Sequence, residues 1–155
     1  TDLALMGGKI MLAKDCMKKI NDLNGLLLLY SSLGDKAGMA ELAELANKEG
    51  KTNISFICYF LLHDFDKCIS TLQSAKRGAE AALFAKTYCP SKITSAVQTW
   101  KEEASQTSKA VSEAIIDPTE FPEIFPDVVA ALSLEPALIE RDSKERPANQ
   151  YTHWA

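Results

Sequence analysis

The sequence predicts an all-α fold, an α-solenoid in which antiparallel helix pairs stack side by side. Two observations lead to this expectation. Seven segments between residues 9 and 106 have the apolar spacing of helices, and no alternating strand pattern interrupts them. The joints between these segments are only two or three residues long, which forces neighbouring helices to run antiparallel.

Five of the segments have one apolar face and one polar face. We expect these amphipathic helices at residues 9–21, 36–49, 65–75, 81–88 and 93–100, because apolar residues recur three or four positions apart in each. The residues of these faces are Ile10, Ala13, Met17 and Ile20; Met39, Leu42, Ala43 and Ala46; Phe65, Cys68, Ile69 and Leu72; Ala81, Phe84, Ala85 and Tyr88; and Ile93, Ala96, Val97 and Trp100.

Two further segments, residues 25–33 and 53–62, are apolar nearly all round. A helix that is apolar on every side is expected to be covered on every side. Such helices alternate here with amphipathic ones, a pattern that favours stacked helix pairs. The repeat length agrees, since successive amphipathic helices begin at residues 9, 36 and 65, which are 27 and 29 residues apart. A helix-pair repeat of this length is typical of a TPR-like superhelix.

The joints contain residues that end and begin helices. Gly34 and Gly50 are placed where a left-handed C-terminal cap is needed, and Pro90 ends the helix before it. Asn53 is interpreted as the N-cap of the helix that follows Gly50.

The chain divides into three parts by its helical periodicity and its proline content. We expect the helix-pair solenoid at residues 1–116, an irregular proline-containing segment with short helices packed on the last repeat at 117–142, and a flexible tail at 143–155. Asp117-Pro118 resembles an N-cap with proline in the first helical position, and Phe121–Pro126 cannot form a continuous helix. We predict that Phe121 or Phe125 packs near Trp100 and closes the end of the stack.

Composition excludes several classes of function. With 17 basic and 21 acidic residues among 155, the net charge of −4 argues against a nucleic-acid partner. The apolar run at residues 26–30 is too short to span a membrane. No secretory signal is apparent, and a chain that begins with Thr1 is expected to be a piece of a longer protein.

The sequence predicts no catalytic, cofactor-binding or metal-binding residues. Cys58, His63 and Cys68 are five residues apart, so on a helix they diverge, and no fourth zinc ligand accompanies them. Asp64 and Asp66 are interpreted as first-turn acids that favour a helix dipole. The four cysteines, none in a CxxC motif, are expected to be reduced thiols. Phosphate-binding and nucleophile motifs are missing, so we expect a protein that is not an enzyme.

Long runs of residues nevertheless resemble a known family. The runs are GLLLLYSSLGD from residue 25, LAELANKEGKTNISFICYFLLHDFDKC from 42, VQTWK from 97, DPTEF from 117 and the Phe-Pro pair at 125–126. They are similar to the C-terminal α-solenoid of the coatomer beta-prime subunit family, over about residues 1–130.

This resemblance implies a structural scaffold subunit of the COPI vesicle coat. Its solenoid would pair with that of the coatomer alpha subunit, in Golgi-to-ER and intra-Golgi transport. The protein would be cytoplasmic, peripheral on Golgi and vesicle membranes, and attached to them only through the coat. Cargo recognition would belong to N-terminal propellers that this sequence does not contain.

Two other classes of function remain open from the residues, a peptide-binding helical-repeat adaptor and a small helical enzyme. For a side-to-side partner, we expect the contact surface on the outer side of the helices at residues 36–49 and 65–75.

Overall fold

The computed structural model describes residues 2–143, without the side chains of 2–6 and 142, and in this range it contains helices and no strand. The predicted all-α class is therefore confirmed. The chain forms two compact units, residues 1–81 and 82–155, and the boundary falls inside α6 (Gly78–Tyr88). The first unit also contains α1 (Asp2–Lys19), α2 (Leu23–Leu33), α3 (Lys36–Lys48), α4 (Thr52–Leu61) and α5 (Phe65–Ser74).

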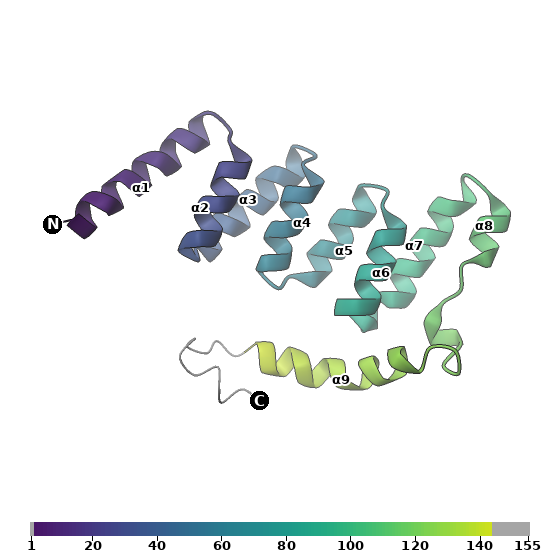
Figure 1. The fold of residues 1–155 in the computed structure, drawn as a ribbon. Coiled ribbons are helices and arrows are strands. Elements are labelled where there is room, and N and C mark those ends of the chain that lie inside the picture. Colours follow the sequence, from purple (N-terminus) through teal and green to yellow (C-terminus); the bar gives the residue numbers. More distant parts are fainter. Residues whose placement is uncertain (1, 144–155) are drawn as a thin grey trace. The chain divides into compact units, whose positions relative to one another are not determined.

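In the first unit, consecutive helices pack against one another from α1 to α5. Figure 1 shows α2 and α4 in one layer and α3 and α5 in a second layer behind them. Helix α2 also contacts α4, its neighbour within the layer. This two-layer stack of antiparallel helices confirms the predicted solenoid arrangement.

One backbone turn recurs at all five joints of the first unit. A residue in the left-handed conformation ends each helix, and the next residue precedes the following helix. In the α4–α5 turn, for example, His63 N donates to Phe60 O (3.0 Å) and Asp64 N donates to Tyr59 O (2.9 Å). The left-handed residues are Asn21, Gly34, Gly50, His63 and Lys76, with φ between 55° and 70°. Each turn is thus a Schellman motif, which reverses the chain within two residues.

Side chains beside these turns cap the next helix. The carboxylates of Asp22, Asp35 and Asp64 each accept a hydrogen bond from the backbone N–H three residues on. The predicted left-handed caps at Gly34 and Gly50 are confirmed. The predicted N-cap at Asn53 is wrong, because the Gly50 turn places Lys51 immediately before α4. Asn53 is inside α4, where its side-chain oxygen accepts a hydrogen bond from Arg77 Nη1 at 2.8 Å.

The core of the first unit is filled between its two layers. Tyr30 of α2 is only 1% exposed. Its ring lies against Gly38 of α3, where a Cβ atom would come within 2.5 Å of Tyr30 Cε1. The buried apolar residues of this unit are Leu23, Leu26, Tyr30, Met39, Leu42, Ala43, Ala46, Cys58, Tyr59, Cys68, Ile69, Leu72 and Ala81.

The expectation that α2 and α4 are covered on every side is wrong. Leu28 of α2 is 72% exposed, and Ile57 and Leu61 of α4 are 43% and 50% exposed. The reason is that each layer of a two-layer stack packs through one face and leaves its outer face open.

The second unit contains α7 (Ile93–Ser105), α8 (Lys109–Ala114) and α9 (Pro126–Asp142), with short 3-10 helices η1 (Pro90–Lys92) and η2 (Pro118–Glu120). The Asp117 cap is confirmed, since its Oδ1 accepts hydrogen bonds from Thr119 N at 2.9 Å and Thr119 Oγ1 at 2.8 Å. The Thr119 and Thr94 hydroxyls lie 3.2 Å apart, which joins this segment to α7. As predicted, residues 121–125 are not helical.

Residues 126–142 form one helix of 17 residues rather than several short ones, although Pro136 lies inside it. Glu135 holds this helix to η1, because its carboxylate accepts hydrogen bonds from Ser91 N at 2.8 Å and Ser91 Oγ at 3.0 Å. The division at residues 116 and 142 stays a prediction, and the flexible tail lies, apart from residue 143, outside the described residues.

Trp100 of α7 is half-buried. The Phe125 ring lies 5.4 Å from Lys86 Nζ of α6, and that ammonium forms an ion pair with Asp127 at 3.1 Å. Lys86 of α6 thus helps to hold the chain around Phe125 in place. Packing of Phe121 or Phe125 on Trp100 stays a prediction.

The left-handed turns predict opposite changes in stability for two substitutions. Gly50→Ala places a Cβ in the left-handed region with nothing within 4 Å, so only backbone strain changes, and the free energy of unfolding should fall by about 1 kcal/mol. Lys76→Gly should raise it by up to about 1 kcal/mol for the same reason. Lys76→Ala, which keeps the strain, serves as the control. Urea unfolding measures all three, and a loss of stability in Lys76→Gly would contradict the argument.

The contact of Tyr30 with Gly38 gives a second prediction. Gly38→Ala should lower the free energy of unfolding by about 1–3 kcal/mol, because the buried ring cannot move away from the new methyl group. Gly7→Ala in α1 has nothing within 4 Å and should instead raise stability by up to about 1 kcal/mol through helix propensity. Equal stability of the two variants in denaturant unfolding would show that the helices separate easily here.

Candidate functional site

The two cysteines and the histidine that the sequence raises as possible metal ligands differ in their exposure to solvent. Cys58 of α4 and Cys68 of α5 are buried, and His63 is exposed in the turn between these helices. Burial raises the pKa of the Cys58 thiol to about 11 and that of Cys68 to about 12. Both thiols are thus protonated near neutral pH, which leaves them poor nucleophiles and poor metal ligands. Among the described residues, no three His, Cys, Asp or Glu side chains form a possible metal site.

The carboxylates of α3 and of the turn before α5 are engaged in ion pairs. Glu44 accepts a hydrogen bond from the Tyr59 hydroxyl at 2.8 Å and pairs with Lys67 at 3.3 Å. Asp64 caps α5 and also lies 3.7 Å from Lys67 Nζ. Burial, followed by the bond to Glu44, raises the pKa of Tyr59 to about 12. The outer side of α3 and α5 is therefore a surface of paired charges, with Leu45 as its one large exposed hydrophobic residue among those described.

The opposite layer of the first unit presents apolar side chains to solvent. We call this the α2–α4 surface, formed by Leu28 of α2 and by Ile57 and Leu61 of α4. Leu28 and Ile57 are each the sixth residue of their helix, as is the exposed Leu83 of α6. A repeated exposed position of this kind is expected to mark a contact surface rather than scattered surface leucines.

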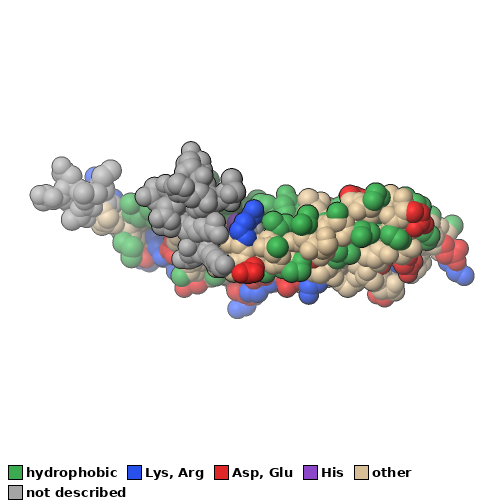
Figure 2. Space-filling model, turned by 90° about the horizontal axis from the view of Figure 1, so that it is seen from below, with side chains coloured by type: hydrophobic (Ala, Val, Ile, Leu, Met, Phe, Trp, Pro, Cys, Tyr) green, Lys and Arg blue, Asp and Glu red, His purple; other side chains and the backbone are tan. Residues whose placement is uncertain are grey.

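A second apolar surface lies on α9. Between Asp127 and Glu140 this helix carries one charged residue, Glu135, which is buried against Ser91. Its exposed large hydrophobic residues are Val129, Leu134, Leu138 and Ile139. Figure 2 shows hydrophobic side chains over α9 with few charged groups among them. No described helix combines the length and hydrophobicity that crossing a membrane requires.

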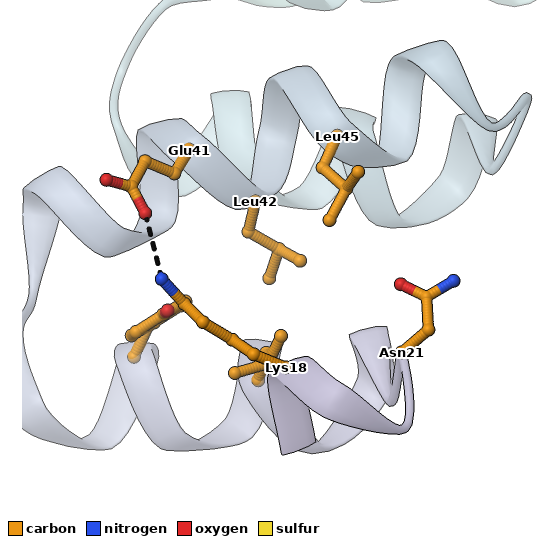
Figure 3. A pocket seen from close by; sticks show the side chains of 7 residues that line it. Lys18, Asn21, Glu41, Leu42 and Leu45 are labelled. Carbon is orange, nitrogen blue, oxygen red and sulfur yellow. Dashed lines mark hydrogen bonds and ion pairs between the residues drawn. The ribbon is translucent and has the colours of Figure 1, made fainter. Parts of the chain in front are cut away.

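A cleft of about 210 Å³ opens between α1, α2 and α3. Its apolar lining comes from Leu26, Leu42 and Leu45, and its polar lining from Lys18, Asn21 and Glu41. Figure 3 shows the Lys18 side chain extended toward Glu41. The two form an ion pair at 3.3 Å, and Glu41, followed by Tyr30, raises the pKa of Lys18. Sequence reasoning missed this cleft, because its residues belong to three helices and form no local motif.

Tyr30 also lines the cleft. Its hydroxyl, like that of Ser55, is buried without a hydrogen-bond partner, and Lys14 Nζ lies 4.9 Å from the centroid of its ring. A buried hydroxyl without a partner lowers stability by about 1–3 kcal/mol relative to a satisfied one. Such a group is a candidate for contacting a ligand.

The comparisons with known proteins agree with this architecture. Residues 1–101 match the family model described as the COPA/B TPR domain. The chain is 42% identical to coatomer subunit beta′-1 and 43% identical to coatomer subunit beta′-3, both of Arabidopsis thaliana, over 150 residues in each case. It is 40% identical over 154 residues to coatomer subunit beta′-1 of Oryza sativa subsp. japonica.

These alignments cover 97–99% of this chain and 16–17% of each relative. The chain therefore spans about a sixth of the length of the curated relatives that it matches. Because the family model matches well over half of the chain, the chain belongs to the COPA/B TPR domain family.

The carboxylate of Asp35, which caps α3, makes stability depend on pH. The Gly38 N–H bond, with help from Lys14, holds the pKa of Asp35 below its ordinary value of 3.8. A lowered folded-state pKa contributes stability that is present above the unfolded value and is lost as pH falls below it. Asp35→Asn keeps the cap but removes the titrating carboxyl group. As pH falls from about 4.5 to about 2.5, the free energy of unfolding of this variant should therefore decrease less than that of the parent. Parallel curves from urea unfolding would contradict this.

Proposed function

We propose that this member of the COPA/B TPR domain family is a structural segment of a COPI coat subunit and assembles side to side with the solenoid of the coatomer alpha subunit. The names of its relatives support the coat subunit role, since all those described above are coatomer beta-prime subunits. The chemistry of the described residues agrees, because the buried Cys58 and Cys68 thiols are protonated near neutral pH and Glu44 is engaged by Tyr59 and Lys67.

The observation that carries the proposal is the exposed α2–α4 surface. It lies inside the matched residues 1–101, so it belongs to the part of the chain that defines the family. Stable protein interfaces bury at least about 1,000 Å² and are centred on aromatic or aliphatic residues. Three exposed aliphatic side chains on two neighbouring parallel helices, Leu28, Ile57 and Leu61, suit the centre of such an interface. A second solenoid, which also presents rows of helices, has the matching shape.

This surface differs from the one that the sequence suggested. The sequence favours the outer side of α3 and α5 only if α2 and α4 are covered. The exposed residues of α2 and α4 remove that reason. The charges on α3 and α5 pair with each other, for example Lys67 with Glu44. Burying paired surface charges in an interface has a desolvation cost that aliphatic side chains do not have. The α2–α4 surface is therefore the better candidate.

The proposed role fixes where the protein works. As a part of the coat, the chain serves Golgi-to-ER and intra-Golgi transport from the cytoplasmic side of the membrane. It reaches Golgi and vesicle membranes through other coatomer subunits. Its task is scaffolding and not catalysis.

Binding to the alpha-subunit solenoid tests the proposal. The double variant Leu28→Asp and Ile57→Asp should weaken capture of that solenoid by at least about tenfold, because two charges then have to be buried among aliphatic groups. The measurement is a pull-down followed by calorimetric titration with the purified alpha-subunit solenoid. Both residues are exposed, so circular dichroism should show an unchanged fold.

Two control variants test whether another surface of the chain makes the contact instead. Lys48→Glu with Asp66→Lys changes exposed charges on α3 and α5 and should leave binding within about twofold. Leu134→Asp with Leu138→Asp changes the α9 surface outside the matched residues and should also have little effect. No binding by the parent chain would overturn the partner. Loss of binding in a control and not in the α2–α4 variant would overturn the surface.

A further inference from the structure

We propose that the cleft between α1, α2 and α3 binds one aliphatic side chain of an extended segment of another protein, and that the Tyr30 hydroxyl donates a hydrogen bond to the backbone of that segment. This site lies on a different part of the first unit from the α2–α4 surface and does not depend on the coat role. It adds recognition of a linear segment to a protein whose other surface suits a folded partner.

The size and lining of the cleft argue for an aliphatic group. Leu26 and Leu42 form a buried apolar wall, and Leu45 of α3 completes it at the surface. The volume of about 210 Å³ accommodates a leucine-sized side chain with room for the backbone that carries it. Burying such a side chain is favourable because it removes apolar surface from water.

The charges at the cleft argue for a neutral ligand. Lys18 and Glu41 neutralise each other across the opening, so neither an anion nor a cation is attracted. A charged ligand would meet a like charge within the same ion pair. Lys18 and Glu41 nevertheless offer a donor and an acceptor 3.3 Å apart. One residue of an extended peptide presents its N–H and its C=O on the same edge and can use both.

Two further polar groups match a peptide backbone. Asn21 donates through Nδ2 to both oxygens of Glu49, at 3.0 and 3.1 Å. Figure 3 shows that its amide oxygen lies on the side of the cleft, where it can accept from a peptide N–H. The buried Tyr30 hydroxyl is an unused donor. A bound carbonyl would satisfy it, so ligand binding removes a penalty that the free protein carries.

Access to Tyr30 requires only a side-chain movement. The Lys18–Glu41 ion pair lies across the opening, and both side chains are well exposed. Exposed ion pairs of this type contribute little to stability, so Lys18 can swing aside at small cost.

The experiment is a titration of the isotopically labelled chain, followed by NMR, with N-acetyl-leucine-N-methylamide as the probe. A ligand this small should bind with a dissociation constant in the millimolar range. Amide shifts at Lys18, Tyr30 and Leu45 should move together and saturate. The matched probe N-acetyl-glycine-N-methylamide has the same backbone without the side chain and should bind at least about tenfold more weakly.

Variants test the two halves of the site. Tyr30→Phe keeps the ring and removes the hydroxyl, so binding should weaken by about fivefold while the thermal midpoint does not fall. Leu45→Asp, at a residue 39% exposed, should abolish binding. Leu33→Asp, at a residue 50% exposed at the end of α2 and outside the cleft lining, is the matched control and should bind as the parent does.

Three results would overturn the proposal. The first is the same response to the glycine and leucine probes, and the second is shifts outside the cleft. The third is unchanged affinity in both Tyr30→Phe and Leu45→Asp. None of these results bears on capture of the alpha-subunit solenoid, which uses Leu28 and Ile57, so the two proposals fail independently.

Discussion

The two-residue Schellman turn is the constraint on which the first unit depends. It occurs at all five joints and closes each helix with the same pair of backbone hydrogen bonds. Because the turn has one geometry, each helix starts at the same place relative to the one before it. Alternate helices then lie in one layer, as α2 and α4 do. The sixth residues of these helices, Leu28 and Ile57, consequently appear at equivalent positions on one open face.

The sequence predicted those parts of the fold that local patterns determine. Apolar spacing located α2 to α7, and Gly34 and Gly50 identified two of the left-handed turns, because glycine reaches that conformation without strain. The turns at Asn21 and His63 have the same conformation with a weaker signal, because asparagine and histidine are enriched in the left-handed region but not confined to it. Lys76 has no such signal, and there the hydrogen bonds of the turn and the packing of the flanking helices hold an ordinary residue in a strained region.

Contacts between distant residues set the limit of the prediction. An exposed leucine such as Leu28 looks the same in sequence as a buried one such as Leu26, so a continuous apolar run could not reveal an open face. Glu135 looks like a solvated residue of a helix, yet it is buried on Ser91, 44 residues away. The cleft has the same origin, since Lys18, Tyr30 and Glu41 meet only after three helices have packed.

The distribution of charge explains why the two layers of the first unit suit different ligands. On α3, Glu41 and Glu44 are held by Lys18 and Lys67, so that layer is polar but locally neutral. Its cleft offers short-range donors and acceptors to a backbone, without a field that would attract ions. The layer of α2 and α4 has exposed aliphatic residues in place of such pairs. It can release water over a broad area when another row of helices covers it. The repeated turn keeps the two layers on opposite sides of the first unit. One layer can therefore make a broad hydrophobic contact, while the other can recognise a peptide backbone through hydrogen bonds.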